Sequence, residues 1–153
     1  MLAALAAAVV ALVAPQTVVQ VPVGDPVLPT GPLVSTGATH EGAVFIEAAS
    51  VVRSDISGLV DGTAVIVTGE AAPLRVMTFW VNCRTHVYQV GSGRQYDAEG
   101  RQTALTPWIR DQPVLPDTGA AAIEAAFCKA GGPDLSTLPV VADWRAALAS
   151  IAR

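Results

Sequence analysis

The two cysteines are the feature that most restricts how this chain can fold. Cys83 lies in a segment where apolar and polar residues alternate, which is the pattern of a half-buried β-strand. Cys128 follows about 45 residues later, near the end of a segment whose apolar residues have helical spacing. If the two cysteines pair, a helix is fixed to a sheet, and closing a loop of this length stabilises the folded state by about 4 kcal/mol.

Length, charge and cysteine usage narrow the functional classes. The 153 residues predict one folded domain, and 52% of them are hydrophobic. A formal net charge of −4 with a single lysine, Lys129, argues against a nucleic-acid partner, because such a partner requires clustered cations. The cysteines are too few for a zinc ribbon and form no Cys-x-x-Cys redox motif. We therefore expect no metal and no cofactor.

The first 14 residues are an uninterrupted apolar run. A helix needs about 20 such residues to span a bilayer, so this run is too short for a stable transmembrane anchor. Its length suits the apolar part of a signal peptide, although no basic residue precedes it and Pro15 directly follows it. A buried Ala-rich helix is the alternative. We expect an exported protein, located in the periplasm or at the cell surface.

A proline-rich stretch leads from this run to the folded part of the chain. Residues 15–41 contain five prolines, which disfavour helices and central strands and favour extended, polyproline-like backbone. We interpret residues 15–41 as a spacer, with an ordered loop crossing the domain as the alternative. The sequence thus places the start of the folded domain at Gly42.

From Gly42 onward, apolar residues recur with a period of two, which predicts an antiparallel sheet. The extended segments are expected at residues 44–53, 59–67 and 74–90. Within the second of them, Asp61-Gly62 predicts a hairpin turn, because this dipeptide accommodates the positive φ that such turns require.

The third extended segment, taken as one long strand or one split by a bend, carries Cys83. In a strand, successive side chains point to opposite faces. Cys83 shares a face with the apolar odd-numbered positions, so Arg84, His86 and Tyr88 are expected on the other face. That face would point away from any helix bound to Cys83.

Helical spacing replaces the alternation after the prolines at 113 and 116. Thr118 is a suitable N-cap for a helix whose apolar side includes Ile123 and Phe127. A second, short helix is expected after Asp143, with Trp144 on its apolar side.

These segments predict an α+β fold, in which an antiparallel β-sheet carries a C-terminal α-helix. Residues 42–130 are expected to form the folded domain. Residues 131–153 are expected to form a C-terminal tail with the short helix.

A series of short motifs runs through the sheet and the first helix. They are Trp80-x-x-Cys83, Tyr96-Asp97-x-x-Gly100, Trp108, a proline-rich bend, and Thr118 ten residues before Cys128. In their order and spacing, over about Val44–Lys129, they resemble the bacterial surface-adhesin protein E family. Asn82 stands where that family has an acidic residue, and the scarcity of lysine argues against acidic or heparin-like partners.

The resemblance implies an exported protein in which a disulfide between Cys83 and Cys128 tethers the C-terminal helix to one face of the sheet. An even number of cysteines in an exported chain favours the same pairing. The named member of the family binds host extracellular-matrix and serum proteins, so the resemblance also implies a protein partner.

No residue pattern typical of an active site is evident. The sequence has two histidines, His40 and His86, and no Gly-x-Ser-x-Gly motif, so we do not expect an enzyme. We expect a non-catalytic binding module whose contact site is the surface around Arg84, His86 and Tyr88, because Arg and Tyr are enriched at the energetic centres of interfaces. The alternative is a structural, envelope-associated periplasmic protein without a discrete ligand.

Overall fold

The computed structural model describes residues 27–54, 58–70, 73–106, 108–129 and 135–151. The strands in these ranges are β1 (Leu33–Thr39), β2 (Gly42–Glu47), β3 (Val52–Ser54), β4 (Leu59–Val67), β5 (Leu74–Asn82), β6 (Val87–Tyr96), β7 (Gln102–Thr106), β8 (Ile109–Pro113) and β9 (Val140–Val141). The α-helices are α1 (Gly119–Phe127) and α2 (Trp144–Ile151), and the single-turn 3-10 helices are η1 (Ala48–Ser50) and η2 (Leu135–Thr137). The α+β class predicted from the sequence is confirmed.

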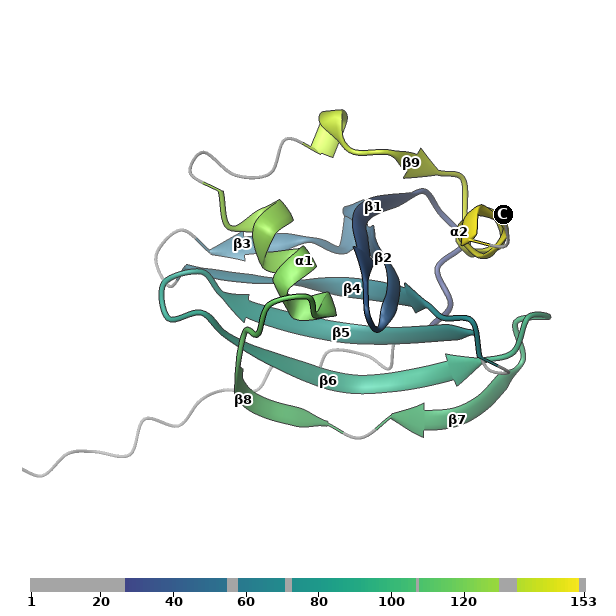
Figure 1. Cartoon of the computed structure of the whole chain (residues 1–153), viewed down its shortest axis with the longest axis horizontal. Coiled ribbons are helices and arrows are strands. Elements are labelled where there is room, and N and C mark those ends of the chain that lie inside the picture. The colour runs from purple at the N-terminus through teal and green to yellow at the C-terminus, as the bar shows by residue number, and fades with distance from the viewer. Residues whose placement is uncertain (1–26, 55–57, 71–72, 107, 130–134, 152–153) are drawn as a thin grey trace, which may run out of the picture.

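The strands form one antiparallel sheet in the order β7-β6-β5-β4-β2-β1-β9. β8 also pairs with β6, so β7 and β8 together make one edge, and β3 pairs with β4. In Figure 1, α1 lies across one face of the sheet, and α2 lies beside β9 at one end. Within the described ranges, neither helix is long and apolar enough to cross a bilayer.

Alternate residues of the central strands enter two different cores, one on each face of the sheet. In β4, Ala64 and Ile66 pack with α1, whereas Val65 and Val67 pack with α2. All four residues are buried, because both faces of this strand are covered. A strand that is covered on both faces has a continuous run of apolar residues in its sequence, and β4 has such a run.

The first core, defined here as the one under α1, contains Val44, Ile46, Val60, Ala64, Ile66, Phe79, Val81, Ile123 and Phe127. The Phe79 and Phe127 rings lie 6.5 Å apart, so the helix packs directly on β5. As predicted, Thr118 caps α1, since its Oγ1 accepts a hydrogen bond from the Ala121 N–H at 3.2 Å.

The second core, under α2, contains Leu33, Phe45, Val65, Val67, Leu74, Val76, Tyr96, Trp144 and Ala147. Trp144 lies over Gly100, where an added Cβ would be 2.9 Å from the indole ring. The expected cap is present here as well, because Asp143 Oδ1 accepts the Ala146 N–H at 2.9 Å.

The predicted spacer is wrong for its last part, because Leu33–Thr39 is strand β1. Leu33 and Val34 are buried, and β1 pairs with β2 on one side and with β9 on the other. Pro32 is the last proline before the strand, so the residues after it have the N–H groups that a sheet requires. The signal-peptide-like segment and the beginning of the spacer lie outside the described residues.

The hairpin turn predicted at Asp61-Gly62 is also absent, because both residues lie inside β4. Gly62 instead permits a close approach of side chains. A Cβ at this position would lie 3.3 Å from the Phe79 ring and 3.3 Å from Ser50 Oγ.

Candidate functional site

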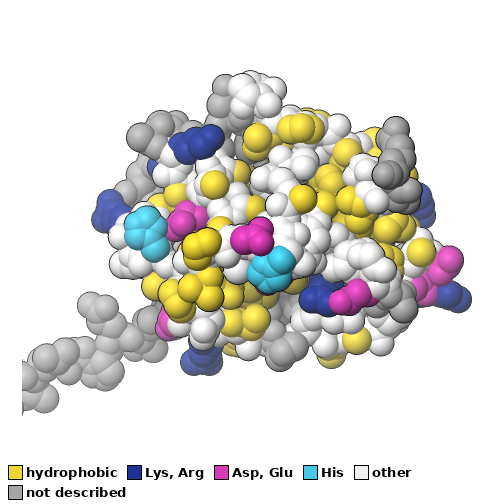
Figure 2. All heavy atoms as spheres, viewed as in Figure 1, with side chains coloured by type: hydrophobic (Ala, Val, Ile, Leu, Met, Phe, Trp, Pro, Cys, Tyr) yellow, Lys and Arg dark blue, Asp and Glu magenta, His cyan; other side chains and the backbone are white. Residues whose placement is uncertain are grey.

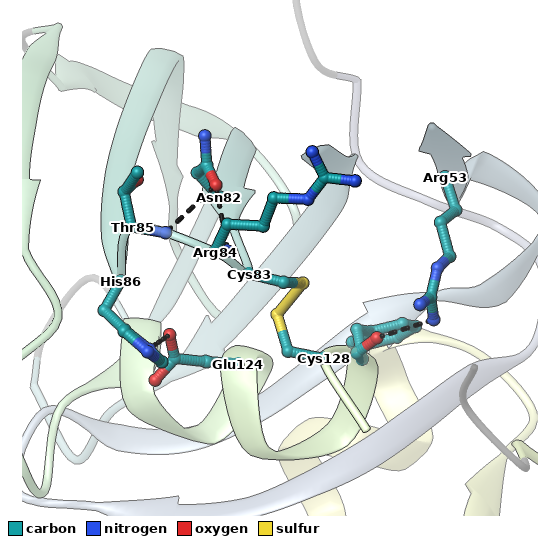
Figure 3. Close-up of a disulfide and its surroundings, with 9 residues drawn as sticks. Arg53, Asn82, Cys83, Arg84, Thr85, His86, Glu124 and Cys128 are labelled. Atoms are coloured by element: carbon teal, nitrogen blue, oxygen red, sulfur yellow. Dashed lines mark hydrogen bonds and ion pairs between the residues drawn. A yellow bond between two sulfur atoms is a disulfide. The ribbon is translucent and has the colours of Figure 1, made fainter. Parts of the chain in front are cut away.

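The disulfide joins the turn between β5 and β6 to the C-terminal end of α1. Cys83 and Cys128 are bonded, with their Cα atoms 5.2 Å apart (Figure 3). Cys128 is the C-cap of α1, and its backbone N–H donates to the Glu124 carbonyl. The predicted tether between helix and sheet is therefore confirmed, and it acts at one end of the helix.

Charged side chains also hold the two ends of α1. At its start, the Gly119 N–H donates to Glu41 Oε2 at 2.7 Å, and at its end, Arg53 Nη1 donates to the Phe127 carbonyl at 3.3 Å (Figure 3). A carboxylate at the N-terminus and a cation at the C-terminus both complement the helix dipole. Neither contact was expected from the sequence, because both partners lie far from α1 in the chain.

Asn82 organises the turn that carries Cys83. Its Oδ1 accepts hydrogen bonds from the N–H groups of Arg84 at 3.0 Å and Thr85 at 3.2 Å, and its carbonyl accepts the His86 N–H at 2.9 Å (Figure 3). His86 has a positive φ of 55°, which is unusual for a residue other than glycine. The segment predicted as one long strand or one split by a bend is two strands joined by a tight turn over residues 83–86.

This turn reverses the predicted orientation of Tyr88. The strands pair as Asn82 with Val87 and as Val81 with Tyr88. Residues directly opposite each other share a face, so Tyr88 lies on the α1 side together with Val81. It packs against the first core, and burial followed by the negative charge of Glu41 raises the pKa of its hydroxyl. The expectation that Tyr88 faces away from the helix is wrong, because the alternation does not continue through the turn.

His86 and Arg84 leave the turn in different directions. His86 Nδ1 lies 2.8 Å from Glu124 Oε1 on α1, and Glu124 is the less exposed partner (Figure 3). Arg84 extends away from His86 and from α1, and its aliphatic part lies against Gly58 (Figure 3). The three residues predicted as a contact site therefore do not form one continuous surface.

Charge is distributed evenly over the face that carries α1. In Figure 2, Lys and Arg side chains lie apart from one another on this face, mostly near its margin, and acidic side chains lie between and beside them. Among the described residues, no group of three or more His, Cys, Asp and Glu side chains could hold a metal ion. The described part of this face therefore shows neither a metal centre nor a strongly charged patch that would indicate a ligand.

The edge formed by β7 and β8 exposes more apolar surface than the turn does. Every residue of β8 is exposed, as are all but the last of β7. Leu105 is 70% exposed, Trp108 is 45% exposed and Ile109 is 38% exposed. The Arg110 guanidinium stacks 4.9 Å above the Trp108 ring. The sequence contains one sign of this edge. Leu105 and Trp108 are apolar residues that do not belong to a periodic, buried face of a strand.

Comparison of the chain with protein-family models, curated proteins and solved structures finds no match. The resemblance to the surface-adhesin protein E family stays a prediction from the motifs.

Proposed function

We propose that this protein is an exported, non-catalytic binding module that takes a protein partner along the edge formed by β7 and β8. The observation that carries the proposal is this exposed edge, where Leu105, Trp108 and Ile109 lie beside backbone that pairs only with β6 among the described strands. Export is supported by the disulfide, since disulfides persist in oxidising compartments.

An open sheet edge offers unpaired N–H and C=O groups to an added strand. Folded proteins usually protect such edges with charged residues, proline or a covering element. This edge has Arg110, Asp111 and Pro113 in β8, but it also exposes leucine, tryptophan and isoleucine. Arginine and tryptophan are also enriched at the energetic centres of interfaces, and here Arg110 and Trp108 are stacked on each other. The edge thus combines backbone pairing with side chains suited to a protein partner.

A non-catalytic role fits the positions of the two histidines. His86 contacts Glu124, and His40 Nδ1 contacts the Asp117 carbonyl. Each ring is therefore engaged with a neighbouring group on or next to α1. The second candidate, a structural envelope protein without a discrete ligand, would leave the β7–β8 edge without a specific partner.

Site-specific photo-cross-linking in the native cell envelope tests the proposal. A photoreactive residue at Leu105 should give a discrete cross-linked product with another protein. The matched control is Val140 on β9, at the opposite edge, because its side chain is 60% exposed against 70% for Leu105.

With the photoreactive residue kept at position 105, a double substitution of Trp108 and Ile109 by lysine should remove that product, while Val140→Lys should leave it unchanged. The thermal midpoint should change little for both variants, because all three side chains are exposed. Equal cross-linking at positions 105 and 140, or none at 105, would favour the structural alternative.

A further inference from the structure

A small pocket lies on the face of the sheet opposite α1, away from the β7–β8 edge. It encloses about 120 Å³ and is lined by two adjacent cross-strand pairs, Asp61 with Trp80 and Thr63 with Thr78. Residues paired in this way point to the same face with their Cβ atoms about 5 Å apart. The side chains of Asp61, Trp80, Thr63 and Thr78 therefore border one small space.

The pocket lies next to the part of this face that α2 covers. The next pair along the same two strands, Val65 with Val76, belongs to the second core under Trp144. The next row, Thr63 with Thr78, belongs to the lining of the pocket and not to that core. Ser50 holds this row in place, because its Oγ accepts the Thr63 N–H at 2.8 Å.

The position of the Trp80 ring depends on a glycine in the neighbouring strand. A Cβ at Gly91 would lie 2.7 Å from the Trp80 ring and 2.3 Å from Thr78 Oγ1. The absent side chain allows the indole to lie over β6. The ring is half-buried there, so it forms a wall of the pocket.

Two polar groups of the pocket have no partner in the described structure. The Asp61 carboxylate makes no hydrogen bond or ion pair with any described residue, and among the described residues that line the pocket Asp61 alone is charged. Burial raises the pKa of this carboxyl. Thr78 is 5% exposed, and its Oγ1 is buried without a hydrogen-bond partner. Unpaired buried polar groups of this kind are costly and uncommon in folded proteins.

We propose that this pocket binds an alkylguanidinium or alkylammonium group, with Asp61 as its counter-charge and Trp80 as the aromatic surface against which it packs. A cation beside a carboxylate restores the missing ion pair, and a cation against an indole gains a cation–π interaction. The N–H groups of the ligand can also donate to the Thr63 hydroxyl.

The size of the pocket limits the ligand to a group about as large as one side chain. Sites for drug-sized ligands and cofactors usually enclose about 300–1,000 Å³, well above the 120 Å³ found here. Such a group can belong to a small amine or to an arginine or lysine of a protein. The inference concerns a different surface from the β7–β8 edge and does not depend on the function proposed for it.

Other charges on this face are compatible with a cationic ligand. Gln89, the residue opposite Trp80, donates to Asp111 Oδ1 at 2.6 Å, which places a second carboxylate on the same row. Arg94 lies opposite Val76, two rows along the strands from Trp80, and its Nη1 donates to Gln102. The row that carries the pocket therefore contains acids and no base among its described residues.

Titration of the full-length protein with a blocked arginine amide, followed by NMR, tests the proposal. The indole N–H signal of Trp80 should shift in a saturable manner, while those of Trp108 and Trp144 serve as internal references. The neutral isostere, a blocked citrulline amide, should leave all three signals in place. Equal binding of citrulline, or of glucose as a neutral polyol, would overturn the proposal.

Substitutions should change the affinity in a predictable order. Asp61→Asn, which keeps the shape of the side chain, should weaken arginine amide binding about tenfold. Val52 pairs directly with Asp61 and is 59% exposed, so its replacement tests the charge without disturbing a core. Val52→Glu should strengthen binding, Val52→Gln should leave it unchanged, and Val52→Lys should weaken it.

Glu99→Gln in the β6–β7 turn serves as a distant control for the loss of one negative charge. An affinity that falls as much in this variant as in Asp61→Asn would contradict a specific site. Two further ligands distinguish a small amine from a protein side chain as the source of the cation. Tighter binding of agmatine indicates a free amine, and tighter binding of a blocked arginine-containing tripeptide indicates a protein side chain. Failure of both to shift Trp80 would overturn the proposal.

Discussion

The two faces of the sheet are each covered by a helix, but the helices are held in different ways. α1 is fixed by a disulfide at one end and by charged contacts at both ends, and it buries Gly119, Ile123 and Phe127. α2 is fixed by packing, with Trp144 and Ala147 buried in the second core. One helix is thus attached covalently and the other by a single large aromatic side chain.

The difference shows how short helices can be kept on a sheet. Helices of this length are marginal in isolation, so each needs an external anchor. Five of the nine residues of α1 are alanine, which form helices well but bury little area, and the disulfide compensates for that deficit. α2 has no such bond and instead places tryptophan, which buries a large apolar surface, at its first position.

The largest effect is expected from removing β1, which supports the α2 face. A chain that starts at His40 lacks Leu33 and Val34 and leaves β2 and β9 without the strand between them. It should lose its cooperative thermal transition. A chain that starts at Val27 keeps every described element and should unfold cooperatively, as followed by circular dichroism. Cooperative unfolding of the shorter chain would show that β1 is dispensable.

Replacing both Cys83 and Cys128 by alanine should lower the free energy of unfolding by about 4 kcal/mol. The loss arises because the unfolded chain is no longer closed into a loop between the two residues. Urea unfolding of the variant and of the oxidised protein measures the difference. Tryptophan fluorescence should still report a buried Trp144, because the second core lies on the other face.

Trp144→Ala should cost about 3 kcal/mol, because it removes a buried aromatic side chain and leaves a cavity. Hydrogen exchange should increase mainly in α2 and β9, while α1 remains protected by its disulfide. Arg145→Ala is a matched control in the same helix, since Arg145 is exposed and stacks on the outside of the Trp144 ring. Uniformly faster exchange in both helices would mean that the two faces unfold as one unit.

The smallest effect is expected from Asp61→Asn on the α2 side of the sheet. Burial raises the pKa of Asp61 in the folded state, so ionisation at neutral pH opposes folding. The penalty is present above the folded-state pKa and disappears below the unfolded value of about 3.9. The variant should therefore melt at a slightly higher temperature at pH 7, and the difference should vanish as the pH falls to about 3.5.

Asp97→Asn provides a control with the opposite sign. The pKa of Asp97 is lowered, first by the hydrogen bond from the Arg101 backbone N–H, and that contribution to stability is lost as the pH falls through the folded-state pKa. This variant should melt at a lower temperature than the natural protein at pH 7. Melting curves that move in the same direction for both variants would contradict the assigned causes.

Features set by local chemistry were predictable from the sequence. The N-caps at Thr118 and Asp143 follow from side chains that accept hydrogen bonds from N–H groups three residues later. Gly100, with a φ of 82°, lies in the turn after β6, where a positive φ favours glycine. The pairing of Cys83 with Cys128 was also predicted, because only two cysteines exist and both lie next to apolar segments.

Features set by contacts between distant segments were not predictable in the same way. β1 was hidden by the prolines before it, because its strand character depends on pairing with β2 and β9 rather than on its own composition. The orientation of Tyr88 depends on the turn made by Asn82, which a strictly alternating pattern does not reveal. The pocket at Asp61 is formed by residues of β4, β5 and the segment at Ser50, and no local pattern brings them together.

The pairing of Leu33 with Val141 joins segments from opposite ends of the described chain. The strands that pair here therefore become available at different times during synthesis. A polypeptide is made and delivered from its N-terminus, so β1 emerges early and waits for a partner that arrives among the last residues. The half of the molecule that contains Cys83 and Cys128 is complete before β9 and α2 emerge. Until then, the outer edge of β1 is unpaired and the second core lacks Trp144. In this interval a nascent chain of this kind is most exposed to wrong strand pairing or to binding by a chaperone.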